Sequence, residues 1–160
     1  MHIQIFTAGG TIDKIYFDDR STYEVGAPKI EEILSEANVN LPYTVELIFR
    51  KDSLHMTGQD RELIREKVLA CPHERIVITH GTDTMAETAR SLGMIPGKTI
   101  VLTGAMAPAR FKTSDAAFNI GCAIAAVQTL PPGVYIAISG RIFDPWHVRK
   151  NREQNWFEET

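Results

Sequence analysis

The chain alternates short apolar runs with longer segments of helical periodicity, and this alternation constrains its fold more than any other feature. The short runs have the length of buried strands, and the longer segments place their apolar side chains on one helix face. Such alternation predicts a three-layer, doubly wound α/β domain with a mostly parallel sheet. The predicted strands are Ile3–Phe6, Thr44–Phe49, Ile76–Thr79, Thr99–Thr103 and Val134–Ile138, and the predicted helices are Pro28–Leu34, Arg61–Ala70, Thr84–Leu92 and Ala116–Leu130.

Further segments bear on this arrangement. Residues 13–26 are polar and show no periodicity, which is typical of a mobile loop or a short hairpin. Residues 57–60 form a capping signal, and Ser114 and Asp115 are placed to cap the helix that follows them. The end of the chain, 150–160, is polar apart from Trp156 and Phe157. We expect this aromatic pair to anchor the end to the domain or to another subunit.

Length, charge and cysteine content exclude several classes of protein. At 160 residues the chain can bury one full core, so we assign residues 1–160 to a single domain. Its net charge of −3 and lack of a basic stripe predict no nucleic-acid partner. No apolar run reaches the roughly 18 residues of a membrane span, and no signal peptide is visible, so we expect a cytoplasmic protein. Cys71 and Cys122 are interpreted as free, buried thiols, and the histidines lack the spacing of metal ligands.

Two loops that contain glycine and threonine follow predicted strands. The first is Thr-Ala-Gly-Gly-Thr-Ile at 7–12, and the second is His-Gly-Thr-Asp-Thr at 80–84. Open α/β sheets bind their ligands at the carboxyl ends of the strands, where these hydroxyls are expected. A threonine hydroxyl attacks a carbonyl only with a base in reach and an oxyanion site nearby. Lys150 and Tyr23 are available as proton acceptors, so the pattern indicates nucleophilic attack on a carbonyl group.

Each of these features also has a structural interpretation. Gly9 and Gly10 alone are typical of a tight turn between a strand and a helix. Thr82 and Asp83 are residues that often cap helices. Tyr23 is compatible with a surface aromatic in a loop, and a lysine near a terminus is usually solvated. The occurrence of all these residues in one chain favours chemistry over these separate explanations.

The motifs resemble those of the bacterial-type L-asparaginases, a family of amidohydrolases with a threonine nucleophile. Residues 7–12 are similar to the first family signature, with Ala8 in place of its first threonine, and residues 80–85 match the second. The segment 23–26 resembles the loop that bears the catalytic tyrosine, and 144–150 resembles the segment with the catalytic lysine. The likeness extends to about residue 151 and covers what the family has as its N-terminal catalytic domain.

The resemblance implies roles for five residues. Thr11 would attack the side-chain amide carbon while Tyr23 takes its proton, and an acyl-enzyme would form as ammonia leaves. Thr82, Asp83 and Lys150 would form a second triad that activates the hydroxyl or the hydrolytic water. Which threonine attacks first stays open. The resemblance implies no metal and no organic cofactor.

It also implies a substrate-binding set. Ser53 would hold the substrate α-carboxylate, Asp83 would hold the α-ammonium, and Gly10 and Gly81 would line the pocket. Leu54 stands where the family has a glutamine that contacts the substrate amine. A leucine cannot accept that hydrogen bond, and the loss of such a contact to a charged group costs about 1.5–3 kcal/mol.

We therefore predict a short-chain asparaginase that hydrolyses L-asparagine to L-aspartate and ammonia. An amidase for glutamine, or for a small amide without a free α-amine, is the first alternative. A domain that binds an amino acid without catalysis is the second. The resemblance implies a homo-oligomer, a dimer or a tetramer. The C-terminal domain that family members usually carry, which contributes an acidic group to a neighbouring site, is absent from the 160 residues.

Overall fold

The structure is a computed structural model that describes residues 1–17 and 22–160. Its strands are β1 (Ile3–Gly9), β2 (Lys14–Phe17), β3 (Thr22–Val25), β4 (Tyr43–Lys51), β5 (Arg75–Thr79), β6 (Thr99–Thr103), β7 (Gly133–Ile138), β8 (Arg141–Phe143), β9 (Val148–Asn151) and β10 (Trp156–Glu159). Its α-helices are α1 (Ile30–Glu36), α2 (Gly58–Ala70), α3 (Met85–Leu92) and α4 (Ala116–Thr129). Short 3-10 helices lie at η1 (Thr11–Asp13), η3 (Ser53–His55) and η4 (Pro145–His147).

The main sheet, within the described residues, has six strands in the order β4-β1-β5-β6-β7-β8. Every neighbouring pair is parallel except β7 and β8, so the predicted mostly parallel sheet is confirmed. β1 lies between β4 and β5, because the chain first adds a strand on one side of β1 and then continues on the other side. The strand order therefore reverses at β1 and β5, where open α/β sheets have their binding crevice.

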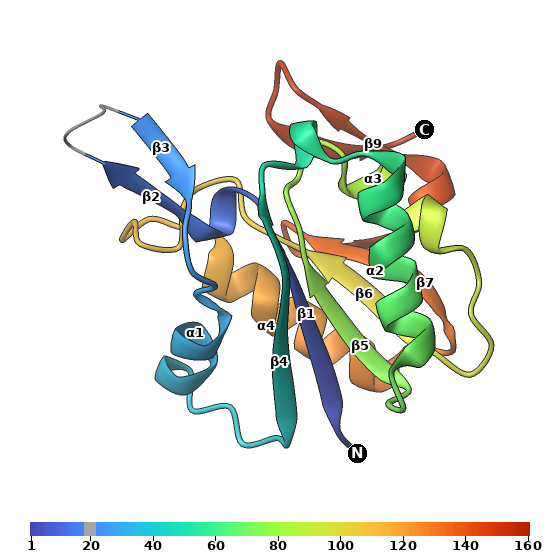
Figure 1. Cartoon of the computed structure of the whole chain (residues 1–160). Helices are drawn as coiled ribbons and strands as arrows, with labels where there is room; N and C mark the ends of the chain where they lie inside the picture. The colour runs from blue at the N-terminus through green and yellow to red at the C-terminus, as the bar shows by residue number, and fades with distance from the viewer. Residues whose placement is uncertain (18–21) are drawn as a thin grey trace.

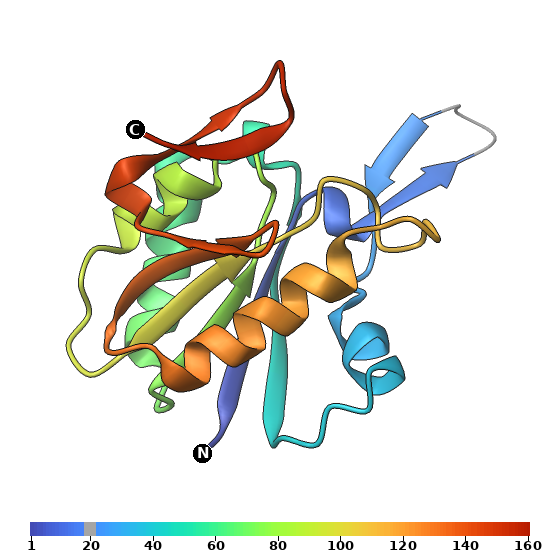
Figure 2. The ribbon, with the colours of Figure 1, turned by 180° about the vertical axis from the view of Figure 1, so that it is seen from behind.

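The sheet forms the middle layer of three. α2 and α3 cover one face, while α1 and α4 cover the other (Figures 1 and 2). Successive residues of a strand point to opposite faces, and β5 follows this rule. Ile76 and Ile78 share a buried cluster with Ile64 of α2, whereas Val77 shares a second cluster with Ile120 of α4. The apolar run of β5 is thus explained by burial on both faces.

Two helices begin at residues other than those predicted, since α2 begins at Gly58 and not at Arg61, although its capping signal is present. The predicted capping box is confirmed, because Thr57 Oγ1 accepts the Asp60 N–H at 3.2 Å and Asp60 Oδ2 accepts the Thr57 N–H at 2.9 Å. The helix predicted to begin at Pro28 begins at Ile30, with Lys29 before it. Pro28 therefore precedes the first turn and does not form part of it.

The prediction that Asp115 caps α4 is wrong. Asp115 has φ −81° and ψ −2°, a helical conformation, whereas a capping side chain requires an extended backbone. Its carboxylate instead accepts the N–H of Met106 at 3.0 Å and of Ala107 at 3.1 Å, and the Asn119 amide at 2.8 Å. Ser114 does contact the helix start, since its hydroxyl accepts the Ala116 N–H at 3.1 Å. Asp115 thus holds the loop after β6.

The end of the chain forms the hairpin β9–β10, which was not predicted from the sequence. Phe157 is 6% exposed, and its ring centroid lies 6.1 Å from that of Phe143, so it packs on the domain itself. Trp156 is 51% exposed and does not pack into the domain core. The hairpin lies at the carboxyl ends of the sheet strands (Figure 1). Lys150 pairs with Phe157 in this hairpin, so the burial of the ring fixes where the lysine lies.

The segment 13–26 contains β2 and β3, which form an antiparallel hairpin that projects from the sheet (Figure 1). Of the two alternatives for this segment, the short hairpin is confirmed. Cys71 is buried as expected, but Cys122 is only half-buried, and both are free thiols. In the described part of the chain, no helix has the length and apolar character to cross a membrane.

Candidate active site

The candidate site lies where two loops leave β1 and β5. Thr7 and Thr79 are partners in the parallel pairing of these strands, so the chain segments after them emerge side by side. Gly9 and Gly10 have φ of 85° and 92°, a region that other residues rarely adopt. A Cβ on Gly10 would overlap the backbone N and Cα of Gly81. Glycine is therefore required for the two loops to touch at the point where the strand order reverses.

Lys150 reaches these loops from β9. Its Nζ donates to Thr82 Oγ1 at 2.7 Å and to Asp83 Oδ1 at 2.8 Å. The Lys150 side chain is 11% exposed, so the ion pair is partly shielded from solvent. Arg152 places Nε 3.7 Å from the same carboxylate oxygen of Asp83. The structure thus brings together Thr82, Asp83 and Lys150, as predicted, although the lysine is 68 and 67 residues away in sequence.

Ser53 lies against Gly81 of the second loop. It is 1% exposed, and its hydroxyl has no hydrogen-bond partner among residues 1–17 and 22–160. A Cβ on Gly81 would lie 2.6 Å from that of Ser53, so the two backbones approach closely. Thr84 Oγ1 donates to the Ser53 carbonyl at 2.9 Å and joins the two loops. Leu54, in contrast, is 53% exposed.

No hydrogen bond joins Thr11 and Tyr23 in the described part of the chain. Thr11 begins η1 and is half-buried, and its hydroxyl makes no hydrogen bond to any described residue. Tyr23 lies on β3 and is 51% exposed. Its ring centroid lies 5.2 Å from Tyr16 and 6.3 Å from Phe111, and within the described chain its hydroxyl also has no partner. The predicted proton transfer between Thr11 and Tyr23 has no counterpart in this arrangement.

A cleft of about 520 Å³ opens between the β2–β3 hairpin and the end of β4. Two ion pairs border it, between Lys14 and Asp52 at 2.9 Å and between Lys51 and Asp60 at 2.8 Å. The Gly9 backbone packs directly against Lys51, so the cleft adjoins the first loop. It is lined by Lys14, Tyr23, Glu24, Val25, Arg50, Lys51, Asp52 and His55.

The two loops and the β9–β10 hairpin all fall within one known family pattern. The sequence profile of the family described as "Asparaginase, N-terminal" matches residues 2–157, a range that includes both loops and most of the hairpin. The chain belongs to the asparaginase family. Its resemblance to that family, predicted from the motifs, is therefore confirmed, as is the single α/β fold.

Three relatives show how far the likeness extends. A glutamyl-tRNA(Gln) amidotransferase subunit from Methanococcus vannielii is 31% identical over 156 residues, which covers 89% of this chain and 35% of that protein. Glutaminase-asparaginase of Acinetobacter glutaminasificans is 30% identical over 129 residues, covering 77% and 38%. The structure of the thermostable L-asparaginase from Thermococcus kodakarensis superimposes with a TM-score of 0.84 at 28% identity, over 99% of this chain and 51% of that one. This asparaginase-family chain therefore spans about half, or less, of the length of these relatives.

Two contacts in the site were not predicted from the sequence. Thr84 belongs to the second motif, but only the fold shows that it binds the Ser53 carbonyl. Arg152 lies in the turn that follows β9, and no local sequence signal indicates that it would be a second cation beside Asp83.

Asp13 ties the Thr11 loop to the base of the β2–β3 hairpin. It is 2% exposed, its Oδ1 accepts the Lys29 N–H at 2.9 Å, and its carbonyl accepts the Gly26 N–H at 2.7 Å. Oδ2 is buried with no partner in the described part of the chain. Burial raises the pKa of Asp13 to about 6, despite the opposing effects of the Lys29 N–H and nearby positive charges. The folded chain therefore favours the protonated form of the Asp13 carboxyl group more than the unfolded chain does.

Asp13→Asn is expected to stabilise the chain at neutral pH more than at acid pH. Because the folded pKa of about 6 lies above the ordinary aspartate value of 3.8, unfolding releases a proton between these two pH values, and the free energy of unfolding falls as pH rises through them. Asparagine keeps Oδ1 and cannot ionise, so its advantage grows by about 2 kcal/mol between pH 4 and pH 7. Urea denaturation of both proteins across this range measures the change, and a difference independent of pH would contradict the assignment.

Proposed function

We propose that this chain provides the catalytic residues of an asparaginase-type amidohydrolase, which converts L-asparagine and water to L-aspartate and ammonia. The observation that carries the proposal is the contact of Lys150 Nζ with both Thr82 and Asp83. A lysine with a purely structural role would not require a contact with a buried threonine hydroxyl. Here the contact occurs on a loop that touches the loop of a second threonine, Thr11.

In the proposed first half-reaction, the Thr11 oxygen attacks the side-chain amide carbon and Tyr23 accepts the hydroxyl proton. The tetrahedral intermediate then collapses, the C–N bond breaks, and the nitrogen takes that proton and leaves as ammonia. Thr11 is left as an ester of the substrate acyl group. This step requires the Tyr23 hydroxyl to come within hydrogen-bond reach of the Thr11 hydroxyl.

In the second half-reaction, water attacks the ester and releases aspartate and the Thr11 hydroxyl. Lys150 and Asp83 orient the Thr82 hydroxyl and the attacking water. The Thr82 backbone N–H has no acceptor among the described residues, so it is available to bind the oxygen on which negative charge develops. The reverse order, with Thr82 as first nucleophile and Lys150 as its base, is the alternative for the first step.

Binding of the amino acid end is proposed to use the buried Ser53 hydroxyl for the α-carboxylate, because an orphaned buried hydroxyl is satisfied by such an acceptor. Asp83 is the proposed partner of the α-ammonium, with Gly10 and Gly81 lining the pocket. Leu54 offers the ammonium no acceptor, and this favours a second candidate function, hydrolysis of an amide without a free α-amine. A homo-oligomer stays a prediction.

An ammonia assay over a panel of amides tests the proposal. We expect turnover of L-asparagine, and we expect Leu54→Gln to lower its KM about tenfold by restoring a hydrogen bond to the ammonium. Leu54→Met is the matched control, since it keeps an apolar side chain, and its KM should stay near wild type. Succinamate, which is asparagine without the α-amine, should not respond to either change.

Two outcomes would contradict this assignment. Faster turnover of succinamate than of asparagine would establish the second candidate in its place. Release of no ammonia from any amide, together with a raised melting temperature in aspartate, would identify a binding domain without catalysis.

A further inference from the structure

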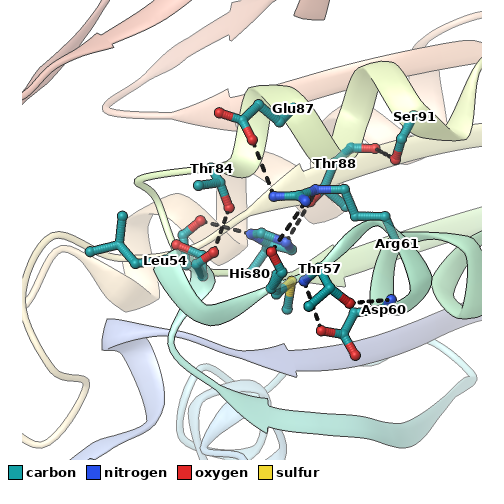
Figure 3. A network of polar contacts seen from close by, with 12 residues as sticks. Leu54, Thr57, Asp60, Arg61, His80, Thr84, Glu87, Thr88 and Ser91 are labelled. Carbon is teal, nitrogen blue, oxygen red and sulfur yellow. Dashed lines mark hydrogen bonds and ion pairs between the residues drawn. The ribbon is translucent and has the colours of Figure 1, made fainter.

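His80 connects the Gly81–Thr82 loop to both helices on one face of the sheet (Figure 3). Its imidazole is fully buried. Nδ1 lies 2.7 Å from the carbonyl oxygen of Gly81, and Nε2 lies 2.9 Å from Thr88 Oγ1. Arg61 Nε donates to the same Thr88 oxygen at 3.1 Å. Three consecutive hydrogen bonds therefore run from α2 through α3 to the loop.

Each of these hydrogen bonds has one allowed direction. The Gly81 carbonyl only accepts, so Nδ1 of His80 must carry the ring proton. Burial lowers the pKa of His80 to about 4, so the ring is neutral at neutral pH and Nε2 is an acceptor. The Thr88 hydroxyl consequently donates to Nε2, while its oxygen accepts from Arg61, which has no acceptor of its own.

The Arg61 end of this chain of bonds is itself fixed. Nη2 contacts Glu87 at 3.2 Å, and Nη1 donates to the Met56 carbonyl at 3.3 Å (Figure 3). Met56 directly follows η3, whose Ser53 carbonyl is held by Thr84. One guanidinium therefore contacts the segment after Ser53 directly and the Gly81–Thr82 loop through Thr88 and His80.

The bond from His80 determines how the Gly81–Thr82 peptide group is turned. A trans peptide is planar with its N–H opposite its C=O, so an N–H whose carbonyl is held by the imidazole points away from the imidazole. We propose that His80, together with Thr88 and Arg61, is a positioning residue that presents the Thr82 N–H and hydroxyl to the substrate in a single orientation. This inference rests on the proposed amide hydrolysis, and none of the three side chains takes part in the chemistry.

Substitution of Thr88 tests the proposal. Thr88→Val removes the hydroxyl with little change of shape, and it should lower kcat for ammonia release about tenfold while KM stays within about twofold. Thr88→Ser retains the hydroxyl and should recover most of the rate. Ser91→Ala is the matched control, because Ser91 Oγ donates to the Thr88 carbonyl on the same helix at 2.7 Å and has no bond to His80. Equal losses in the valine and serine variants would indicate packing and overturn the proposal.

Nitrogen NMR of the His80 ring tests the directions without any substitution. The ring proton is expected on Nδ1, and a proton on Nε2 would overturn the proposal. The Thr82 backbone amide resonance should move in Thr88→Val but not in Thr88→Ser. Because these signals do not depend on turnover, their presence in an inactive wild type would reject amide hydrolysis and retain the positioning role. A Thr88→Val variant with the wild-type rate would overturn the positioning role and leave the proposed amide hydrolysis in place.

Discussion

Thr11→Ala is expected to lower ammonia release from asparagine by at least about 10³-fold, because a methyl side chain cannot attack the amide carbon or carry the acyl group. The fold should be retained, since the half-buried Thr11 hydroxyl makes no hydrogen bond within the described residues. Steady-state assays at saturating asparagine, together with the melting temperature, measure both expectations. Thr11→Ser should retain a measurable rate because it keeps a hydroxyl.

The neighbouring strand residue Thr7 provides the matched control. It is fully buried, and its hydroxyl has no partner in the part of the chain that the structure describes. Thr7→Val should therefore leave the rate unchanged. Full activity in Thr11→Ala would remove Thr11 as nucleophile and transfer that role to Thr82.

Lys150→Met is expected to lower kcat by about 10²- to 10⁴-fold, the usual contribution of a positioned acid–base group. Methionine has a similar length but neither donates to Thr82 nor neutralises Asp83, which Lys150 contacts at 2.7 Å and 2.8 Å. The Asp83 carboxylate would then keep its contact with Arg152, whose Nε lies 3.7 Å from Oδ1. Single-turnover measurements with asparagine would show which half-reaction is slowed.

Arg149→Met is the control for this substitution. Arg149 precedes Lys150 on β9, is exposed, and pairs with Glu158 at 2.8 Å on the outer side of the hairpin. Its loss removes a positive charge and a surface ion pair, which contributes little to stability. A Lys150→Met rate as high as that of Arg149→Met would show that the second triad is misassigned.

The layered fold was predictable because its strands and helices carry local signals. The β5 run from Ile76 to Ile78 is apolar on both faces, and the Thr57 capping box marks the start of α2. The position of both threonine loops at the carboxyl ends of strands was also predicted. What remained unpredicted depends on contacts between distant residues. Nothing near Phe157 in sequence shows that its ring is buried against Phe143.

The candidate site shows the same division. Motifs predicted that Lys150 would meet Thr82 and Asp83, and the fold places them in contact. They did not predict that the Tyr23 ring would pack on the rings of Tyr16 and Phe111, because side-chain packing in a hairpin depends on its neighbours. The direction of each hydrogen bond at His80 could be assigned only from the structure, because it depends on which donor and acceptor atoms lie within bonding distance of the two ring nitrogens.

The placement of Lys150 on a late hairpin has a consequence for biosynthesis. A ribosome makes the five parallel strands of the sheet, from β1 to β7, before residue 150 is added to the chain. Thr82 and Asp83 therefore lack their contact with Lys150 until Phe157 has been made and packs against Phe143. A chain truncated before β9 would contain all five parallel strands and both threonine loops yet lack the lysine that the proposed hydrolysis requires, so formation of the sheet is separate from completion of the candidate site.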